Sequence, residues 1–270
     1  MDLSFVDALV LPRTRAELPA PAPDTAYLAG GTWLYSQPQP HVRRIVDLAG
    51  FGWPALTVTA DGLDIAATCT IEQLVTATYP TEWTATPLFR RCADALVASW
   101  KIWHTATVGG NLASSLPAGA ITAAMCALDG ELTIWQPDGG ERTEPASTFV
   151  TGDGTNTLAP GEIVRSIRIP DAALRAVVAA RKIAYSARGR SGALVLGRRG
   201  TDGLTLTVSA ATVRPHVVHF DRVPSARELA DALPARGWLL DPHGTPDWRR
   251  HVTGVLAEQV RGQLESGDVQ

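Results

Sequence analysis

Two adjacent glycines in the stretch Thr107-Val108-Gly109-Gly110-Asn111 constrain the fold more than any other feature of this sequence. Because glycine has no Cβ, the backbone there can adopt either sign of φ and turn its N–H groups toward an oxyanion such as a phosphate. A second pair stands near the start of the chain, in Leu28-Ala29-Gly30-Gly31-Thr32. We expect the two turns to hold one diphosphate from opposite sides; a plain turn at each pair is the alternative.

Both glycine pairs lie between segments with regular periodicity. Residues 26–29 form a short apolar run that predicts a buried strand leading into the first pair, and residues 32–35 are expected to begin a helix whose positive end faces it. Before the second pair, residues 87–98 carry apolar side chains at helical spacing. After it, residues 120–128 predict a buried helix of small residues.

The rest of the chain indicates a mixture of strands and helices. Asp61-Gly62 predicts a β-hairpin with a type I′ turn, and the segments starting at Thr70 and Ser225 are capping boxes that open short helices. The last helix, residues 247–264, has one apolar stripe that favours core packing over a partner-binding face, with Arg249 on another face. The remaining predicted strands are residues 42–48, 56–59, 63–66, 131–136, 141–144, 162–170, 181–186, 193–196, 204–213 and 216–220, and residues 152–156 are expected to form a surface loop.

Length and charge exclude several classes of protein. The chain has 270 residues, enough for two domains, and its formal net charge of -3 argues against capture of nucleic acid or anionic membrane. No segment is long and apolar enough to span a bilayer. Cys69, Cys92 and Cys126 stand far apart among apolar neighbours, which favours buried reduced thiols in a cytoplasmic protein. Neither the cysteines nor the histidines have the spacing of metal ligands.

Catalytic motifs are missing from the sequence. It has no Gly-x-Ser-x-Gly elbow, no P-loop and no His-Glu-x-x-His, and neither glycine pair has the third glycine of a dinucleotide-binding Rossmann turn. We therefore expect the side chains to hold a cofactor that brings its own reactivity, and we assign no catalytic and no metal-binding residue.

A basic stretch near the C-terminal third allows three interpretations. A solvated strand edge is favoured, because lysine and arginine there discourage edge pairing. A cofactor contact by Lys182 or a docking patch for an acidic partner comes next, and nucleic-acid binding ranks last. The stretch comprises Arg181, Lys182, Arg188, Arg190, Arg198 and Arg199.

Four motifs, in order, resemble the FAD-binding medium subunit of the molybdenum hydroxylase family, which includes carbon monoxide dehydrogenase and bacterial xanthine dehydrogenases. They are Ala29–Thr32 (Ala-Gly-Gly-Thr), Val46–Leu48 (Val-Asp-Leu), Ala106–Asn111 (Ala-Thr-Val-Gly-Gly-Asn) and Gly161–Pro170. Residues 246–252 also look like the closing helix of the family. The likeness covers nearly the whole chain, and four ordered motifs are far more specific than either glycine pair.

The resemblance implies an α+β chain with two domains. An FAD-binding domain of vanillyl-alcohol-oxidase type would cover residues 1–171, in subdomains of about 1–54 and 55–171, and a smaller C-terminal α+β domain would cover residues 172–270. By the same likeness, backbone N–H groups of the two glycine loops hold the FAD diphosphate, and four further residues touch the flavin or its chain. These residues are Leu28, Ala29, Gly30, Gly31, Thr32, Trp33, Leu34, Thr107, Val108, Gly109, Gly110 and Asn111 in the loops, and Val97, Ala98, Val164 and Lys182 outside them.

The resemblance also implies a function in electron transfer. FAD would receive electrons from a 2Fe–2S small subunit, in a complex with a molybdopterin large subunit, and pass them to NAD, a quinone or another acceptor. One alternative is a stand-alone flavin oxidoreductase that uses His104 or Tyr185 as a proton carrier. Another is a scaffold that has lost tight FAD binding, since Ala120 stands where the family has an aspartate on the adenosine side. Trp103 stands where the family has an arginine. It either alters the electronic properties of the flavin or the docking of a subunit, or it only packs against neighbouring side chains.

Overall fold

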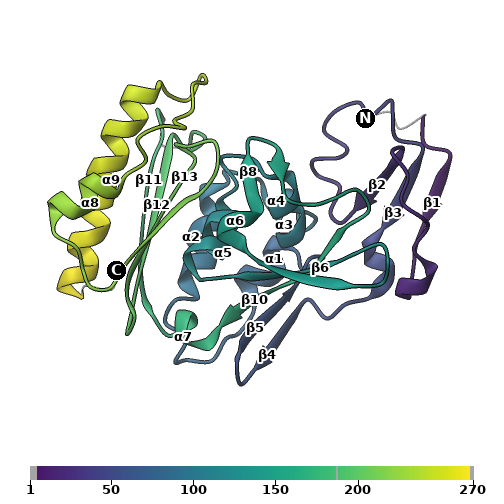
Figure 1. Ribbon diagram of the computed structural model, residues 1–270, viewed down its shortest axis with the longest axis horizontal. Helices are drawn as coiled ribbons and strands as arrows, with labels where there is room; N and C mark the ends of the chain where they lie inside the picture. The colour runs from purple at the N-terminus through teal and green to yellow at the C-terminus, as the bar shows by residue number, and fades with distance from the viewer. Residues whose placement is uncertain (1–4, 187, 268–270) are drawn as a thin grey trace.

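The computed structural model describes residues 5–186 and 188–267, which form three main sheets arranged in a row (Figure 1). A three-stranded sheet, in the order β1-β3-β2, lies at one end. The five-stranded sheet β4-β5-β10-β6-β7 is central, and the four-stranded sheet β11-β12-β13-β14 lies at the other end. The central sheet joins distant parts of the chain, because β10 inserts between β5 and β6.

The N-terminal unit is a small parallel sheet. Its strand β3 pairs in parallel with both β1 and β2, so the strand expected at residues 26–29 is confirmed and the one at 42–48 is confirmed in a shorter form. The helix expected at residues 32–35 is wrong: the segment forms only a turn, in which the Tyr35 N–H donates to Gly31 O at 2.9 Å. Strand β1 was not predicted, because three residues are too few to show a period. The elements are β1 (Ala8–Val10), η1 (Arg15–Glu17), β2 (Thr25–Leu28), β3 (Arg44–Asp47) and η2 (Leu48–Phe51).

The central sheet is antiparallel throughout, and its first hairpin is confirmed with a changed turn. Thr59 pairs with Gly62, so the turn residues are Ala60 and Asp61. Gly62 has a φ of 140°, and a Cβ there would lie 2.8 Å from the Asp171 nitrogen. Glycine is therefore needed at this position because the end of β10 passes close to its backbone. Residues 152–156, expected to be a loop, belong in part to a small hairpin. The strands are β4 (Leu56–Thr59), β5 (Gly62–Ala66), β6 (Glu131–Trp135), β7 (Glu141–Pro145), β8 (Val150–Gly152), β9 (Thr155–Asn156) and β10 (Ile163–Pro170).

Helices fill the space between the central and C-terminal sheets (Figure 1). Helix α5 packs against α2 and α4 on one side and against β12 and β13 on the other, and all eight of its residues are buried. This enclosure explains its small residues, because a helix covered on every side has room for few large ones. Both hydrogen bonds of the capping box expected at Thr70 are present. The helices are α1 (Ile71–Thr76), α2 (Pro87–Ala95), α3 (Trp100–Trp103), α4 (Val108–Ser114), α5 (Ala120–Ala127), α6 (Ala146–Phe149) and α7 (Asp171–Leu174).

The C-terminal unit is an antiparallel sheet whose outer face is covered by the long helix α9 (Figure 1). Thr245 accepts a hydrogen bond from the Trp248 N–H at the start of α9, and Gly267 ends it with a φ of 75°. The capping box at Ser225 is complete at the start of α8. The elements are β11 (Val177–Ile183), β12 (Ala193–Gly200), β13 (Gly203–Ser209), β14 (His216–Phe220), α8 (Ala226–Ala232) and α9 (Pro246–Ser266).

Arg249 corrects the predicted arrangement of α9. The sequence places it away from the apolar stripe, yet its side chain is fully buried. Its guanidinium donates to Ala210 O at 2.7 Å and forms an ion pair with Asp241. A buried arginine is tolerated because carbonyl groups and a carboxylate meet its donors there.

Arg198 corrects the interpretation of the basic stretch. Because it lies on the interior strand β12 and is 4% exposed, it is not part of a solvated strand edge. Its guanidinium donates to Ala127 O at the C-terminal end of α5 and pairs with Asp129. A cation at that position satisfies a helix carbonyl that has no partner within the helix.

The three cysteines are free and buried, as expected. Burial raises the pKa of Cys69, Cys92 and Cys126 to about 12, which keeps these thiols protonated and unreactive near neutral pH. In the described part of the chain, no helix has the length and apolar character needed to cross a membrane.

Candidate functional site

The first glycine pair lies against the residues that directly precede the second glycine-pair segment. A Cβ on Gly30 would lie 2.8 Å from the carbonyl carbon of Thr105 and still closer to its oxygen, so only glycine allows this approach. Gly31 has a φ of 69°, and the Tyr35 ring packs where its Cβ would stand. The first loop therefore lies directly against the segment that leads into α4.

The first loop has a row of unused hydrogen-bond donors. The backbone N–H groups of residues 30–34 donate to no acceptor among the described residues. The N–H of Thr107, a residue that is 4% exposed, likewise has no acceptor in the described part of the chain. Residues 30–34 are half-buried or exposed, so this cluster of N–H groups is open to an anion with several oxygen atoms.

The second glycine pair forms the first turn of α4 and not a loop, which corrects the expectation from sequence. Val108 and Gly109 donate their N–H groups to Cys69 O and Ala67 O, both at 2.9 Å, and Gly110 donates to Thr107 Oγ1 at 3.0 Å. The Asn111 N–H donates to Thr107 O, also at 2.9 Å. These four N–H groups are therefore not available for a phosphate.

Gly109 has a packing reason to be glycine. A Cβ at this position would lie 2.7 Å from Ala67 Cα, because α4 begins directly against the end of β5. Gly110 is less confined, since the nearest atom to its Cβ would be Thr107 Oγ1 at 2.9 Å. The pair thus lets α4 approach the central sheet closely.

The other four predicted contact residues are spread over three regions. Val97 is 43% exposed with a φ of 55°, and it follows α2 together with Ala98. Ser191, in the hairpin after β11, lies 3.4 Å from Ala95 O, so the C-terminal unit reaches this end of α2. Lys182 lies on β11, and burial lowers its pKa.

Val164 lies deeper than the other predicted contacts. Its side chain is 5% exposed and belongs to the core that also contains Val108 of α4. Strand β10 has a register shift between Val164 and Ser166, which leaves its backbone irregular there. No hydrogen bond or ion pair among the described residues joins Val164 or Lys182 to the first loop.

Aromatic and apolar side chains near the loops are unusually exposed. Trp33 is 47% exposed, Tyr35 37% and Trp100, at the start of α3, 66%. Ile102 is 38% exposed and lies three residues before Thr105. Apolar surface beside unused N–H donors is the combination that a ligand with a planar ring and an anionic group would cover.

The residues named for the alternative functions have local partners. His104 forms an ion pair with Glu72, and Tyr185 packs its ring 4.6 Å from that of Trp248. Ala120 is 1% exposed at the start of α5. His104 and Glu72 thus form one partly exposed acid–base pair, whereas the Tyr185 hydroxyl has no hydrogen-bond partner among the described residues.

Trp103 packs, as one of the two interpretations had it. Its ring lies against the main core with the Arg90 guanidinium 5.1 Å from its centre, and its indole N–H is buried without a partner among the described residues.

The described residues contain no group of three or more histidine, cysteine or acidic side chains able to hold a metal.

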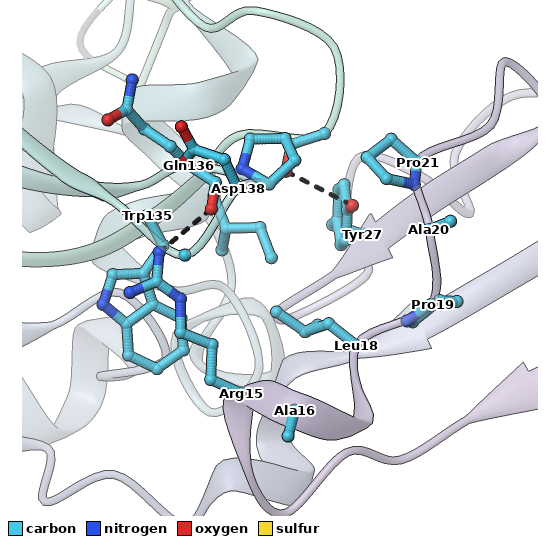
Figure 2. A pocket seen from close by; sticks show the side chains of 14 residues that line it. Arg15, Ala16, Leu18, Pro19, Ala20, Pro21, Tyr27, Trp135, Gln136 and Asp138 are labelled. Carbon is cyan, nitrogen blue, oxygen red and sulfur yellow. Dashed lines mark hydrogen bonds between the residues drawn. The ribbon is translucent and has the colours of Figure 1, made fainter.

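A separate cavity of about 450 Å³ lies where the N-terminal unit meets the turn between β6 and β7 (Figure 2). Trp135 and Ile163 line it, whereas their neighbours Ile134 and Val164 face the core on the α4 side, so the cavity is on the other face of the sheet. Arg15 spans it, donating to Gln136 O at 3.0 Å and covering the Trp135 ring at 4.7 Å. We assign this cavity to the joint between two units, apart from the glycine loops.

Comparison with protein families gives the class of the chain. Residues 11–172 match the family described as the FAD binding domain in molybdopterin dehydrogenase. Because the match covers more than half of the chain, the chain belongs to this family, and the resemblance seen in the sequence is confirmed. The chain is an FAD-binding component of an oxidoreductase. A comparison with curated protein sequences finds no match.

Solved structures show the same fold. The crystal structure of quinoline 2-oxidoreductase from Pseudomonas putida 86 has a TM-score of 0.79 and 20% identity, with 99% of both chains covered. Carbon monoxide dehydrogenases from Oligotropha carboxidovorans and Hydrogenophaga pseudoflava each have a TM-score of 0.79 and 19% identity. Each comparison covers 97% of this chain and 98% of the matched dehydrogenase chain. At this identity they establish the fold, which is the expected α+β class.

Proposed function

We propose that this chain is the FAD-binding electron-transfer subunit of a molybdenum hydroxylase-like oxidoreductase. The observation that carries the proposal is the row of backbone N–H groups at residues 30–34, which have no acceptor in the described chain and lie against the segment leading into α4. An FAD diphosphate offers the anionic oxygens that such a row requires. Family membership supplies the identity of the cofactor.

Each part of the site has a proposed task. The N–H groups of residues 30–34 and of Thr107 bind the diphosphate, while Trp33 shields it from water. Val97 and Ala98 contact the flavin ring, beside the hairpin that carries Ser191. When bound, FAD supplies the redox chemistry, since it accepts and releases electrons in steps of one or two. The protein then needs no general acid or base of its own to deliver electrons onward.

The domain plan is part of the proposal. An FAD-binding domain of vanillyl-alcohol-oxidase type would span residues 1–171, in subdomains of about 1–54 and 55–171, with a C-terminal domain over 172–270. Support comes from the three sheets, which fall within residues 8–47, 56–170 and 177–220. The first two ranges would hold FAD between them, because Gly30 comes from one and Thr105 from the other.

We further propose that the electrons come from a 2Fe–2S small subunit in a complex that also holds a molybdopterin large subunit, and leave to NAD or a quinone. A cytoplasmic location completes the proposal, supported by three buried thiols that form no disulfide.

Titration of the purified chain with FAD tests the central claim. We expect saturable binding of one FAD per chain, seen as quenching of flavin fluorescence and a rise in the melting temperature. Photoreduced flavoprotein, mixed without oxygen with NAD or a quinone, then identifies the acceptor by the return of the oxidised flavin absorption. A folded chain that rejects FAD contradicts the proposal.

A further inference from the structure

The Asn111 side chain is fixed by the start of α5. Its Oδ1 accepts two hydrogen bonds from Thr122, one from the backbone N–H at 3.0 Å and one from the hydroxyl at 3.1 Å. Because a backbone N–H can only donate, the atom facing Thr122 must be the amide oxygen. The NH2 group of Asn111 is therefore directed away from α5.

The NH2 group is available as a donor. Asn111 Nδ2 has no hydrogen-bond partner among the described residues. The atom is not buried, so a ligand can reach it. The backbone N–H groups of residues 108–111 are all used within the chain. The side-chain amide is thus the free donor that this turn of α4 offers.

We propose that Thr122 is a positioning residue for FAD binding: it locks the Asn111 amide so that Nδ2 faces the diphosphate of FAD. This inference rests on the proposed position of the diphosphate beside the first loop. Without the hydroxyl bond the amide is held less firmly and rotates more readily to present its oxygen, which would repel the phosphate oxygens.

The surroundings of the pair fit a fixed geometry. Thr122 is 2% exposed, so water does not compete for its hydroxyl. A Cβ on Gly119 would lie 2.9 Å from Leu116 O, 3.2 Å from Asn111 Oδ1 and 3.3 Å from Thr122 Oγ1, so glycine is required by the backbone of this turn and also keeps space open for the pair. Residues 111, 119 and 122 form one unit that joins α4 to α5.

Thr122→Val tests the proposal, because valine has nearly the same shape and lacks the hydroxyl. We expect the Kd for FAD, measured by flavin fluorescence, to rise about five- to tenfold, because the backbone N–H alone then holds the amide and its rotated orientation becomes populated in the FAD-free chain. Thr122→Ser keeps the hydroxyl and should stay within about twofold of the original chain. Riboflavin, which has no phosphate, should bind Thr122→Val and the original chain equally.

Thr212→Val is the matched control. Thr212 is 3% exposed and its hydroxyl donates to Arg214 O at 2.6 Å, so the substitution removes a buried hydroxyl bond in the C-terminal unit. It should lower the melting temperature without changing the Kd for FAD. The same pattern in Thr122→Val would overturn the proposal and reduce Thr122 to a structural residue.

Asn111→Asp keeps the inference falsifiable if Thr122→Val fails to fold. The aspartate still accepts both bonds from Thr122 but replaces the donor by a negative oxygen, so we expect the Kd for FAD to rise at least about 100-fold while the FAD-free chain melts no lower. Unchanged FAD affinity in this variant overturns the inference. Failure of the original chain to bind FAD would instead overturn the proposed function.

Discussion

The two glycine pairs have the same residues and use the backbone in opposite ways. At Gly30-Gly31 the N–H groups that follow have no acceptor in the described chain, whereas at Gly109-Gly110 every N–H of the helical turn is bonded within the protein. Both pairs allow a close approach between two parts of the backbone. A glycine pair therefore indicates close packing, and only an account of its hydrogen bonds shows whether it can also hold an anion.

Gly30→Ala should have the largest effect on the cofactor. The new Cβ would meet the Thr105 backbone, which has no rotamer to change, so the loop with its free N–H groups must move. We expect the Kd for FAD to rise about 100-fold or more, a loss of about 3 kcal/mol, in flavin fluorescence titrations. Most of the core should survive, since residue 30 is not part of it.

Gly262→Ala is the control for this substitution, because nothing lies within 4 Å of a Cβ there. It should leave FAD binding unchanged and add about 1 kcal/mol of helix stability at most. A folded Gly30→Ala chain that binds FAD normally would break the comparison, because the first loop would then not hold the cofactor.

Gly109→Ala should act on stability instead. Its Cβ would collide with Ala67 at the end of β5, and forcing extra volume into a packed interior costs about 1–3 kcal/mol. Urea unfolding of the FAD-free chain measures the loss. The folded fraction should bind FAD within about threefold of the original affinity. A large loss of FAD affinity with unchanged stability would mean that both pairs serve the cofactor in the same way.

Gly110→Ala should have the smallest effect of the three. The nearest atom to its Cβ is the Thr107 hydroxyl oxygen, on a side chain that can adjust, and alanine favours a helix by about 1 kcal/mol over glycine. Weakening of the Thr107 cap offsets part of this gain, by about 1 kcal/mol. The net change in unfolding free energy should stay within about 1 kcal/mol in the same urea experiment. A cost as large as that of Gly109→Ala would show that the turn is packed equally on both sides.

Local sequence patterns predicted much of the fold. The capping boxes at Thr70 and Ser225 are complete, because both partners lie within one turn of each other. The alternation of residues 162–170 predicted β10, and the small residues of 120–128 predicted the enclosed helix α5. The capping bonds come from neighbours in the sequence, whereas β10 and α5 were predicted from their alternation and composition although their packing partners are remote.

Long-range contacts were not predictable in the same way. The burial of Arg249 depends on carbonyl groups of Gly192 and Ala210, which are 57 and 39 residues away. The bonding of residues 108–111 depends in part on Ala67 and Cys69. Charge and periodicity at one position carry no information about such partners.

The sequence by itself determined the family, because four ordered motifs and their spacing survive in the linear order of residues. It also determined the α+β class, through local periodicity and caps. Only the tertiary structure decided which glycine pair keeps its N–H groups free and which way the Asn111 amide points. The physical reason is that a hydrogen bond is used or free according to what lies beside it in space, and those neighbours come from remote segments of the chain.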